Sequence, residues 1–331
     1  MATNVQVKIQ GIRVEEFGSP QVMKYADFEL RAPGKGEARV RLHAAGVNFI
    51  DIYQRRGTYP VNLPWTPGLE GAGVVEAVGE GVTTVKPGDR VAYTSVPGSY
   101  AQAIIAPADK LIPLPPELSF EQGAAFPLQG MTAHYLLHEF HKLQPGDTVL
   151  IHAAAGGMGL LLVQWAKHLG ARVLGTVSSE QKAKTAREAG ADEVIIYTEQ
   201  DFVKESKCLT DDKGPDFIID GVGKDTFTKD LQAVRTRGHV VIFGSASGPA
   251  EPVLPNSLQA RSITVSGGSL FNYMNTREEL LMRANGVIQG IKEGWLRLKV
   301  DHILPLREAG TAHEMLENRR TTGKVVLTCE A

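Results

Sequence analysis

The stretch Val149-Leu150-Ile151-His152-Ala153-Ala154-Ala155-Gly156-Gly157-Met158-Gly159 decides the fold. An apolar run enters a turn of small residues, and residues 157–169 follow with an apolar helical face. The turn carries the fingerprint A-x-x-G-x-x-G on Ala153, Gly156 and Gly159. Small residues let the backbone approach a pyrophosphate, and the first N–H groups of the helix face its negative charge. The stretch therefore predicts a dinucleotide-binding turn.

Strand and helix patterns alternate around this turn. Strands are expected at residues 148–152, 172–177, 193–196, 217–220, 239–243 and 262–265. Helices are expected at residues 157–169, 179–189, 201–209 and 225–233. Such alternation predicts an α/β domain, a doubly wound parallel sheet of the Rossmann type, over residues 130–267.

The sequence before and after this domain has a different pattern. Short β-rich runs at residues 38–43, 73–78 and 90–93 alternate with Gly and Pro turns, which predicts a small barrel. A helix is expected at residues 276–293, and the β-like run 324–328 is expected to rejoin the first domain. We therefore predict one domain from residues 1–129 and 268–331, interrupted by residues 130–267.

The end of the second expected strand distinguishes NADP from NAD. An NAD site usually carries Asp or Glu about 20 residues beyond the first glycine, where it binds the ribose hydroxyls. Residues 175–179 hold no acid there, whereas Ser178 offers a hydroxyl and Lys182 follows one helical turn later. Because these groups suit an adenosine 2′-phosphate, NADPH is favoured. Glu180 keeps NAD open, and Lys182 is also compatible with an ordinary solvated position.

Composition narrows the class of protein. The chain has 331 residues, a net charge of −2 and no basic stripe, so no nucleic-acid partner is expected. Two cysteines, Cys208 and Cys329, are too few for a disulfide scaffold or structural zinc. No signal peptide or membrane-spanning run is recognisable, and a cytoplasmic protein is expected.

Several motifs, in the same order along the chain, resemble the quinone oxidoreductases. They are GVNFIDIY at residues 46–53, PGLEGAGVV at 67–75, GDRV at 88–91, the 153–159 turn and FGS at 243–245. These enzymes form the zeta-crystallin-like, zinc-independent branch of the medium-chain dehydrogenase/reductase superfamily. The likeness covers essentially the whole chain. It implies a GroES-like catalytic domain interrupted by the Rossmann domain, an active site between the two, and a homodimer.

The resemblance also implies roles for individual residues. Those at the nicotinamide end and expected to be catalytic are Asn48, Asp51, Tyr53 and Tyr59. Those expected to bind the cofactor are Asn48, Gln129, Thr132, Ala155, Gly156, Gly157, Met158, Ser178, Lys182, Tyr197, Phe243, Ser245, Ser247 and Arg319. Ser266-Gly267-Gly268 stands where some relatives carry an arginine, and that contact stays unassigned.

No zinc is expected. Zinc-dependent members have Cys and His in the first two motifs, where this chain has Asn48 and Leu69. His134, His138, Glu139 and His141 do not follow the metalloprotease order and are interpreted as helix-surface residues.

A substrate that delocalises its own negative charge suits a metal-free site. Quinones and conjugated enones both do so, which leaves a quinone reductase and an enone reductase open. Tyr53 is the candidate hydrogen-bond donor, or else it only packs against the nicotinamide. A non-catalytic NADPH-binding protein, structural or RNA-binding, is a third hypothesis, against which the near-neutral charge counts.

Overall fold

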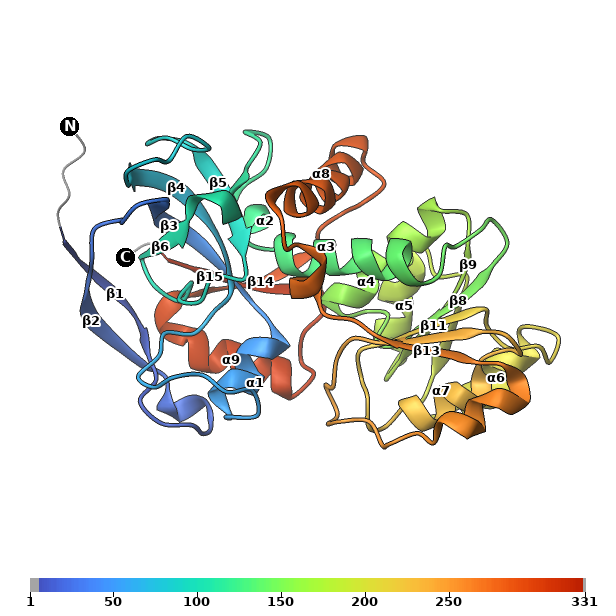
Figure 1. Ribbon diagram of the computed structural model, residues 1–331. Coiled ribbons are helices and arrows are strands. Elements are labelled where there is room, and N and C mark those ends of the chain that lie inside the picture. The colour runs from blue at the N-terminus through green and yellow to red at the C-terminus, as the bar shows by residue number, and fades with distance from the viewer. Residues whose placement is uncertain (1–5, 330–331) are drawn as a thin grey trace. The chain divides into compact units, whose positions relative to one another are not determined.

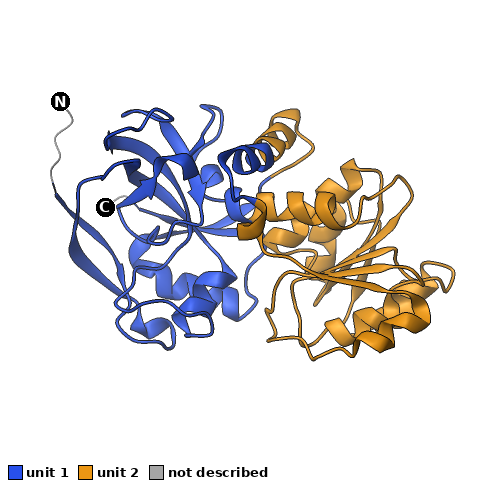
Figure 2. Ribbon diagram, in the orientation of Figure 1, with its two compact units in different colours: residues 1–128, 274–284, 298–331 blue, residues 129–273, 285–297 orange. Residues whose placement is uncertain are grey.

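A computed structural model describes residues 6–329 of the chain, which divides into two compact units (Figure 2). Unit 1 comprises residues 1–128, 274–284 and 298–331, and unit 2 comprises residues 129–273 and 285–297. The first boundary between the units, after residue 128, lies one residue before the boundary that the sequence predicted, after residue 129. Residues 268–273 and 285–297, which were predicted for the first domain, group with unit 2. Helix α8 (Arg277–Glu293) thus contributes residues to both units.

Unit 2 contains a six-stranded parallel sheet. In spatial order its strands are β10 (Glu193–Ile196), β9 (Arg172–Val177), β8 (Thr148–Ile151), β11 (Phe217–Asp220), β12 (His239–Ile242) and β13 (Thr264–Gly267). Counted along the chain this is the order 3-2-1-4-5-6 of the Rossmann fold, so the predicted doubly wound sheet is confirmed. The strand order reverses between β8 and β11, which is where such sheets bind ligands.

Helices cover both faces of this sheet (Figure 1). Helices α4 (Gly157–His168) and α5 (Glu180–Glu188) lie on one face, and α6 (Phe202–Cys208) and α7 (Phe227–Ala233) lie on the other. Side chains define where two of them begin: the Ser179 hydroxyl accepts the Lys182 N–H, and Asp201 accepts the N–H groups of Val203 and Lys204. Helix α3 (Pro127–Tyr135) continues as a π-helix over Leu136–Phe140.

The predicted strand at residues 262–265 is displaced in the structure. Strand β13 begins only at Thr264, because a 3₁₀ helix (Pro255–Arg261) precedes it and ends at Ser262 in the left-handed conformation, with a φ of 50°. Helix α7 likewise begins two residues later than residue 225, since Thr226 donates its hydroxyl to the carboxylate of Asp220. The strand and the helix are therefore shorter at their N-terminal ends than the apolar pattern predicts, because polar turns precede them.

Unit 1 is built mainly from antiparallel strands. Strands β1 (Val7–Arg13) and β2 (Lys24–Leu30) pair with each other. The seven-stranded sheet contains β3 (Glu37–Val47), β4 (Glu70–Val78), β5 (Arg90–Thr94), β6 (Ala103–Pro107), β7 (Ile112–Pro113), β14 (Val300–Pro305) and β15 (Lys324–Thr328). Strand β15 pairs antiparallel with β3, which confirms that residues 324–328 rejoin the first part of the chain.

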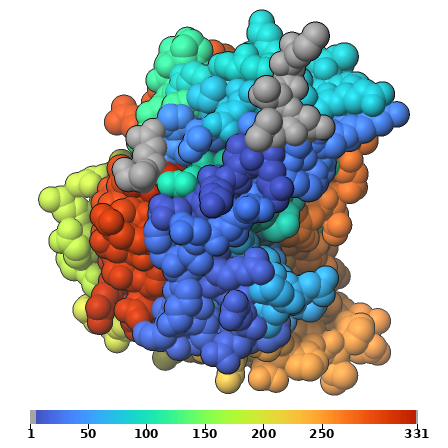
Figure 3. Space-filling model, turned by 90° about the vertical axis from the view of Figure 1, so that its left-hand side faces the viewer, coloured from blue at the N-terminus to red at the C-terminus, as the bar shows by residue number. Residues whose placement is uncertain are grey.

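Besides the first part of α8, unit 1 contains the helices α1 (Phe49–Arg55), α2 (Phe120–Gly123) and α9 (Ala309–Glu317). The sequence interpretation missed α9 and β14. In the space-filling view the red surface of residues near 300–328 lies directly beside the blue N-terminal segments (Figure 3). Unit 1 is therefore assembled from parts of the chain that are far apart in sequence.

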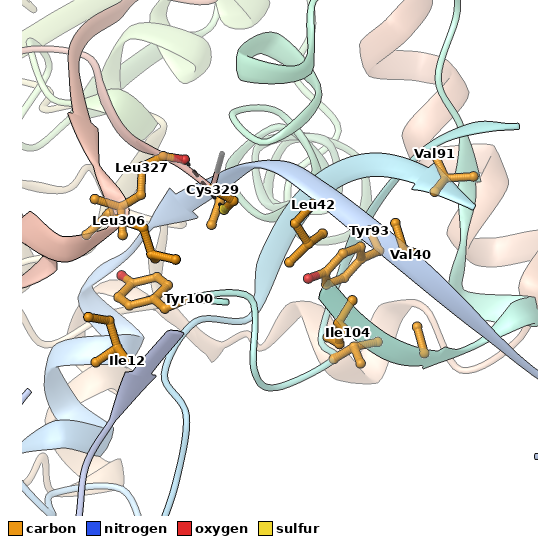
Figure 4. Close-up of a cluster of buried hydrophobic side chains, with 14 of the residues drawn as sticks. Ile12, Val40, Leu42, Val91, Tyr93, Tyr100, Ile104, Leu306, Leu327 and Cys329 are labelled. Atoms are coloured by element: carbon orange, nitrogen blue, oxygen red, sulfur yellow. Dashed lines mark hydrogen bonds between the residues drawn. The ribbon is translucent and has the colours of Figure 1, made fainter. Parts of the chain in front are cut away.

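The core of unit 1 has the same mixed origin. Ile12, Leu42 and Tyr100 pack in one buried cluster with Leu306 and Leu327 (Figure 4). Full burial of one such side chain is worth about 1.5–3 kcal/mol, so the late residues are a substantial part of the stability. Within residues 6–329, none of the helices has the length and apolar character needed to span a bilayer.

Candidate functional site

The predicted dinucleotide turn lies at the reversal point of the unit 2 sheet. It leaves β8, whose neighbours are β9 and β11, and runs into the first turn of α4. Gly156 is the extended N-cap residue of this twelve-residue helix. A Cβ atom on Gly159 would collide with the carbonyl oxygen of Ala153, so the turn closes this tightly only around a glycine. The N–H groups of the first helical turn have no intrahelical acceptor and can bind an anion.

Gln129 and Phe243 flank the glycines at this edge of the sheet. A Cβ atom on Gly157 would lie 2.5 Å from the Gln129 Oε1 atom, so this amide lies directly against the turn. Phe243 follows β12, and its ring lies against Gly221, which follows β11. Gln129 thus lies by the turn that follows β8, and Phe243 follows β12 and packs on the residue after β11, so both lie at the carboxyl edge of the sheet, where a dinucleotide would lie.

Thr132, Ser245 and Ser247 also belong to unit 2. Thr132 is a buried residue of α3, one helical turn after Gln129. Ser245 borders Gly223, and Ser247 follows in the same loop. The Ser247 hydroxyl already accepts the N–H of Asp225 and donates to the carbonyl of Val222. Ser247 therefore organises the loop after β11.

Hydroxyl and amine groups gather at the end of β9. Ser178 is partly buried, Ser179 caps α5, and Lys182 lies in the first turn of that helix. Glu180, the acid that follows Ser179, is exposed and paired with Arg187 at 2.7 Å. Tyr197 is exposed immediately after β10, with its N–H on the Val177 carbonyl. This end of β9 can accommodate a phosphate and presents no carboxylate from the strand itself.

A buried polar pair stabilises the entry to the turn. The His152 Nε2 atom lies 2.7 Å from Asp230 Oδ1, and the His152 Nδ1 atom lies 2.8 Å from the Thr176 hydroxyl oxygen. Both ring nitrogens are therefore hydrogen-bonded. Burial lowers the pKa of His152, but the Asp230 carboxylate outweighs this and raises it. Burial raises the pKa of Asp230 to about 7 against the opposing effect of His152. The pair fixes the residue that immediately precedes Ala153.

In unit 1 the centre of the candidate site is the N-terminus of α1. Asn48 is its N-cap residue, and the side chain is buried. Its Nδ2 atom donates to Glu70 at 2.9 Å, and its Oδ1 atom accepts from the Lys324 ammonium at 2.7 Å. Lys324 also donates to Glu70 at 2.6 Å, and both side chains are almost completely buried. Asn48 is therefore fixed by a buried ion pair from β4 and β15.

Asp51 is held by a second set of buried groups. Its Oδ2 atom accepts the N–H of Asn48 at 2.9 Å and the hydroxyl of Tyr100 at 3.0 Å. Burial raises the pKa of Asp51 to about 7, while the two hydrogen bonds and Lys324 act in the opposite direction. Asn48 and Asp51 are both buried, and their hydrogen bonds hold the N-terminus of α1 in position.

Tyr53 and Tyr59 are the two accessible members of the predicted catalytic set. Tyr53 is partly buried, and its ring lies 5.2 Å from that of Tyr59 and 6.1 Å from that of Phe49. Tyr59 is exposed in the loop after α1, where the backbone N–H groups of Thr58 and Tyr59 donate to the Tyr53 carbonyl. Arg319 is exposed in unit 1 just after α9, with a left-handed φ of 56°. Unit 1 thus brings the four predicted catalytic residues together, and most predicted cofactor residues belong to unit 2.

Four buried residues of this region were missed by sequence reasoning: Glu70, Tyr100, His313 and Lys324. A weak signal existed for two of them. Glu70 begins the small-residue strand β4 and Lys324 begins the apolar strand β15, and charges in such strands are seldom buried unless they are paired. Tyr100 and His313 carry no comparable signal, because their partners are more than 40 residues distant.

The four residues of the H-x-x-x-H-E-x-H pattern do not converge. The ring centroids of His134 and His138 lie 4.5 Å apart, both rings pack edge-on against Trp165, and both side chains are half-buried rather than fully exposed. His141 pairs with Asp147 at 3.1 Å and stacks on Phe217. Across residues 6–329, no group of three or more His, Cys, Asp or Glu residues is arranged to hold a metal ion.

Two protein families match parts of the chain. "Alcohol dehydrogenase GroES-like domain" matches residues 34–116, and "Zinc-binding dehydrogenase" matches residues 157–285. The first match lies in unit 1 and confirms the predicted GroES-like domain. The second lies in the dinucleotide-binding region.

The residues present do not fit the zinc that the second family's description names. The Asn48 oxygen and the Glu70 carboxylate bind the Lys324 ammonium, and Leu69 supplies only a buried alkyl group. Zinc in such sites is bound by thiolate, imidazole and carboxylate ligands. A lysine cation thus takes the oxygen ligands that this edge of unit 1 offers.

Relatives match nearly the full length of the chain. A quinone oxidoreductase of Pseudomonas aeruginosa is 44% identical, over 96% of this chain and 98% of its own. A 2-haloacrylate reductase of a Burkholderia species is 42% identical over the same shares. The crystal structure of Escherichia coli quinone oxidoreductase complexed with NADPH is 41% identical, covers 96% of this chain and 99% of its own, and has a TM-score of 0.94. The chain belongs to the quinone oxidoreductase family of the medium-chain dehydrogenase/reductase superfamily.

Proposed function

We propose that this protein is an NADPH-dependent quinone reductase. The observation that carries the proposal is the small-residue turn at the head of α4, together with Ser178 and Lys182 and no acid at the end of β9. The relative from Escherichia coli is described as complexed with NADPH. When bound, NADPH supplies a hydride to the acceptor.

The proposed cofactor residues have distinct tasks. Ala155, Gly156, Gly157 and Met158 would lie against the pyrophosphate, and the N–H groups of Gly157 and Met158 would bind it, because they belong to the first turn of the twelve-residue helix α4. Ser178 and Lys182 would bind the 2′-phosphate, with Tyr197 beside the adenosine. The remaining contacts would come from Gln129, Thr132, Phe243, Ser245, Ser247, Asn48 and Arg319.

The proposed catalytic residues stabilise charge on the substrate. A quinone delocalises its developing negative charge, so one neutral hydroxyl donor from the protein is sufficient. Tyr53 is that donor in the proposal, since it is the partly accessible tyrosine on α1. Tyr59 packs beside it, and Asn48 and Asp51 orient the helix that carries it.

Steady-state kinetics test the proposal. Purified protein with NADPH and a panel of benzoquinones and naphthoquinones should oxidise NADPH only when a quinone is present. Tyr53→Phe should lower kcat by about tenfold or more while KM for NADPH stays within about twofold. Tyr25→Phe, an exposed tyrosine of β2, should change neither value. If no quinone supports NADPH oxidation, the proposed activity is wrong.

An enone reductase is the second candidate, and one observation favours it: the Burkholderia relative is named for reducing a 2-haloacrylate, a conjugated acid. The same hydroxyl and helix would serve a conjugated C=C, since its negative charge is also delocalised. Comparison of kcat/KM for a quinone and for a conjugated enone decides between the two.

The proposal includes a cytoplasmic homodimer. Cys208 and Cys329 are both free thiols, which fits a reducing compartment. The family resemblance is the support for two subunits. Light scattering on a size-exclusion column should give about twice the chain mass of 35.8 kDa; a monomeric mass would contradict that part.

A further inference from the structure

Four buried side chains form an unbroken hydrogen-bond chain behind α1. Arg55 Nη1 lies 3.0 Å from His313 Nδ1, His313 Nε2 lies 3.1 Å from the Tyr100 hydroxyl, and that hydroxyl lies 3.0 Å from Asp51 Oδ2. All four side chains are fully buried. The chain joins α9 to the first turn of α1 through Tyr100, which lies in the segment between β5 and β6.

The direction of each hydrogen bond in this chain follows from chemistry. A guanidinium group can only donate, so His313 Nδ1 must be the acceptor and carries no proton. Burial and the Arg55 charge lower the pKa of His313 to about 3, so the ring is neutral and its proton is on Nε2. That N–H donates to the Tyr100 oxygen, and the Tyr100 O–H donates to Asp51. Every hydrogen bond therefore points toward the carboxylate.

This chain cannot conduct protons. Its first member, Arg55, stays protonated and is itself bound to Glu317 at 2.6 Å and to the Gly18 carbonyl at 3.0 Å. What it can do is polarise the Tyr100 hydroxyl, because successive hydrogen bonds of one direction strengthen each other.

Asp51 depends on few partners. Its Oδ1 atom is buried and has no hydrogen-bond partner among residues 6–329, so Oδ2 alone receives the N–H of Asn48 and the hydroxyl of Tyr100. The other charged groups that act on it are Lys324 and, with the opposite sign, Glu70. Removal of the Tyr100 hydroxyl would leave the carboxylate with a single donor.

We propose that His313 and Tyr100 are positioning residues: they keep Asp51 an acceptor, and Asp51 then holds the Asn48 N–H and the N-terminus of α1. Helix α9 is in this way coupled to the helix that carries Tyr53. Only the turnover readout below rests on the proposed function. The other readouts need no enzymatic activity.

The first experiment titrates Asp51 by NMR on protein labelled with ¹³C at the aspartate carboxyl, with Asp51→Asn to identify the resonance. In Tyr100→Phe the midpoint of this titration should move upward by about one pH unit, because the lost donor favoured the ionised form. Tyr93→Phe is the matched control: Tyr93 is equally buried in the same cluster, and its hydroxyl takes no part in the hydrogen bonds that join Arg55 to Asp51 (Figure 4). Equal midpoints in the two variants would overturn the proposal.

The second experiment concerns His313 itself. ¹⁵N spectra of the unmodified protein should show a neutral ring protonated on Nε2 from pH 5 to pH 8; an imidazolium or an Nδ1–H tautomer at pH 7 would contradict the chain as drawn. His313→Leu should raise the Asp51 midpoint, whereas His313→Gln, which can still donate to Tyr100, should restore part of the change.

With a quinone that supports turnover, the pH profile of kcat/KM should shift upward together with the Asp51 midpoint in Tyr100→Phe and should stay where it is in Tyr93→Phe. An unchanged profile together with a shifted carboxyl titration would show that Asp51 does not affect the reaction. A protein without quinone activity would leave the NMR tests intact.

Discussion

The candidate functional regions of the two units are held by different means. In unit 2 the dinucleotide turn is shaped mainly by neighbours within a few residues, since Ala153 packs on Gly159 and Ser179 caps α5, and the buried His152–Asp230 pair supports its entry. In unit 1 the N-terminus of α1 is held by side chains from β4 and β15 and, through Tyr100, by α9; two of these elements are more than 200 residues away. The turn in unit 2 relies mainly on small residues and backbone, and the helix in unit 1 relies on a network of buried charges.

The difference has an energetic consequence. A backbone turn loses function when a side chain is added, because there is no room for it. A buried charge network loses stability when a partner is removed, because the remaining charge stays desolvated and unpaired. The variants below test whether the two halves fail in these two ways.

The largest effect should come from Lys324→Met. It leaves the Glu70 carboxylate buried without its counter-ion, which should cost about 3–5 kcal/mol in the free energy of unfolding. Lys299→Met removes a partly exposed pair with Asp301 and should cost less than about 1 kcal/mol. Denaturant unfolding measures both. The double variant Lys324→Met/Glu70→Gln should recover part of the loss; equal costs for the two single variants would refute a buried network as the main support of unit 1.

Gly159→Ala should have the next largest effect. Its Cβ atom would collide with backbone of Ala153 and Ala154, and overpacking of this kind costs about 1–3 kcal/mol. Calorimetry should show NADPH binding weakened by about tenfold or more. Gly267→Ala in β13 meets nothing within 4 Å and should bind normally. Unimpaired binding by Gly159→Ala would mean that the turn does not hold the pyrophosphate.

Lys182→Ala should weaken NADPH binding by about tenfold and leave NADH binding unchanged, because one charge-assisted contact to the 2′-phosphate is lost. Lys184→Ala on the same helix removes an exposed lysine and should change neither affinity. The ratio of the dissociation constant for NADPH to that for NADH is the quantity that decides. An equal loss for both cofactors would place Lys182 away from the phosphate.

Per pH unit, the smallest effect should be a dependence of the free energy of unfolding on pH. Burial raises the pKa of Asp51 to about 7, above its value in the unfolded chain. The folded protein therefore binds more protons there between about pH 4 and 7, and this contribution to stability falls as pH rises through that range. The slope for one group is at most about 1.4 kcal/mol per pH unit.

Asp51→Asn should abolish this part of the pH dependence, whereas Asp27→Asn, at an exposed position of β2, should retain it. Unfolding curves at pH 5, 6 and 7 provide the comparison. Parallel pH profiles for the unmodified protein and Asp51→Asn would show that Asp51 is not strongly desolvated.

The sequence predicted those strands whose bounds depend on local patterns of apolar and turn residues. The run 217–220 and the strands 172–177, 193–196 and 324–328 were predicted with the bounds that the structure has, because their apolar residues are flanked by turns. Helix α9 was missed, since it lies between two short strands without a distinctive capping pattern.

The candidate site was predictable to a different extent in each unit. The glycines of the turn can be recognised in the sequence, because a close backbone approach requires small residues. The partners of Asn48 do not, because nothing local to Glu70 or Lys324 shows that β4 and β15 flank the same strand. Buried long-range pairs become visible only when the pairing of the strands is known.

The antiparallel pairing of β15 with β3 also concerns biosynthesis. A ribosome makes Glu70 254 residues before Lys324, which corresponds to about 13–50 s at ordinary elongation rates. During that interval β3 lacks its partner β15 and the Glu70 carboxylate lacks its counter-ion, and all of the unit 2 strands are made before the interval ends. The unit 2 sheet can therefore form before the unit 1 sheet is complete.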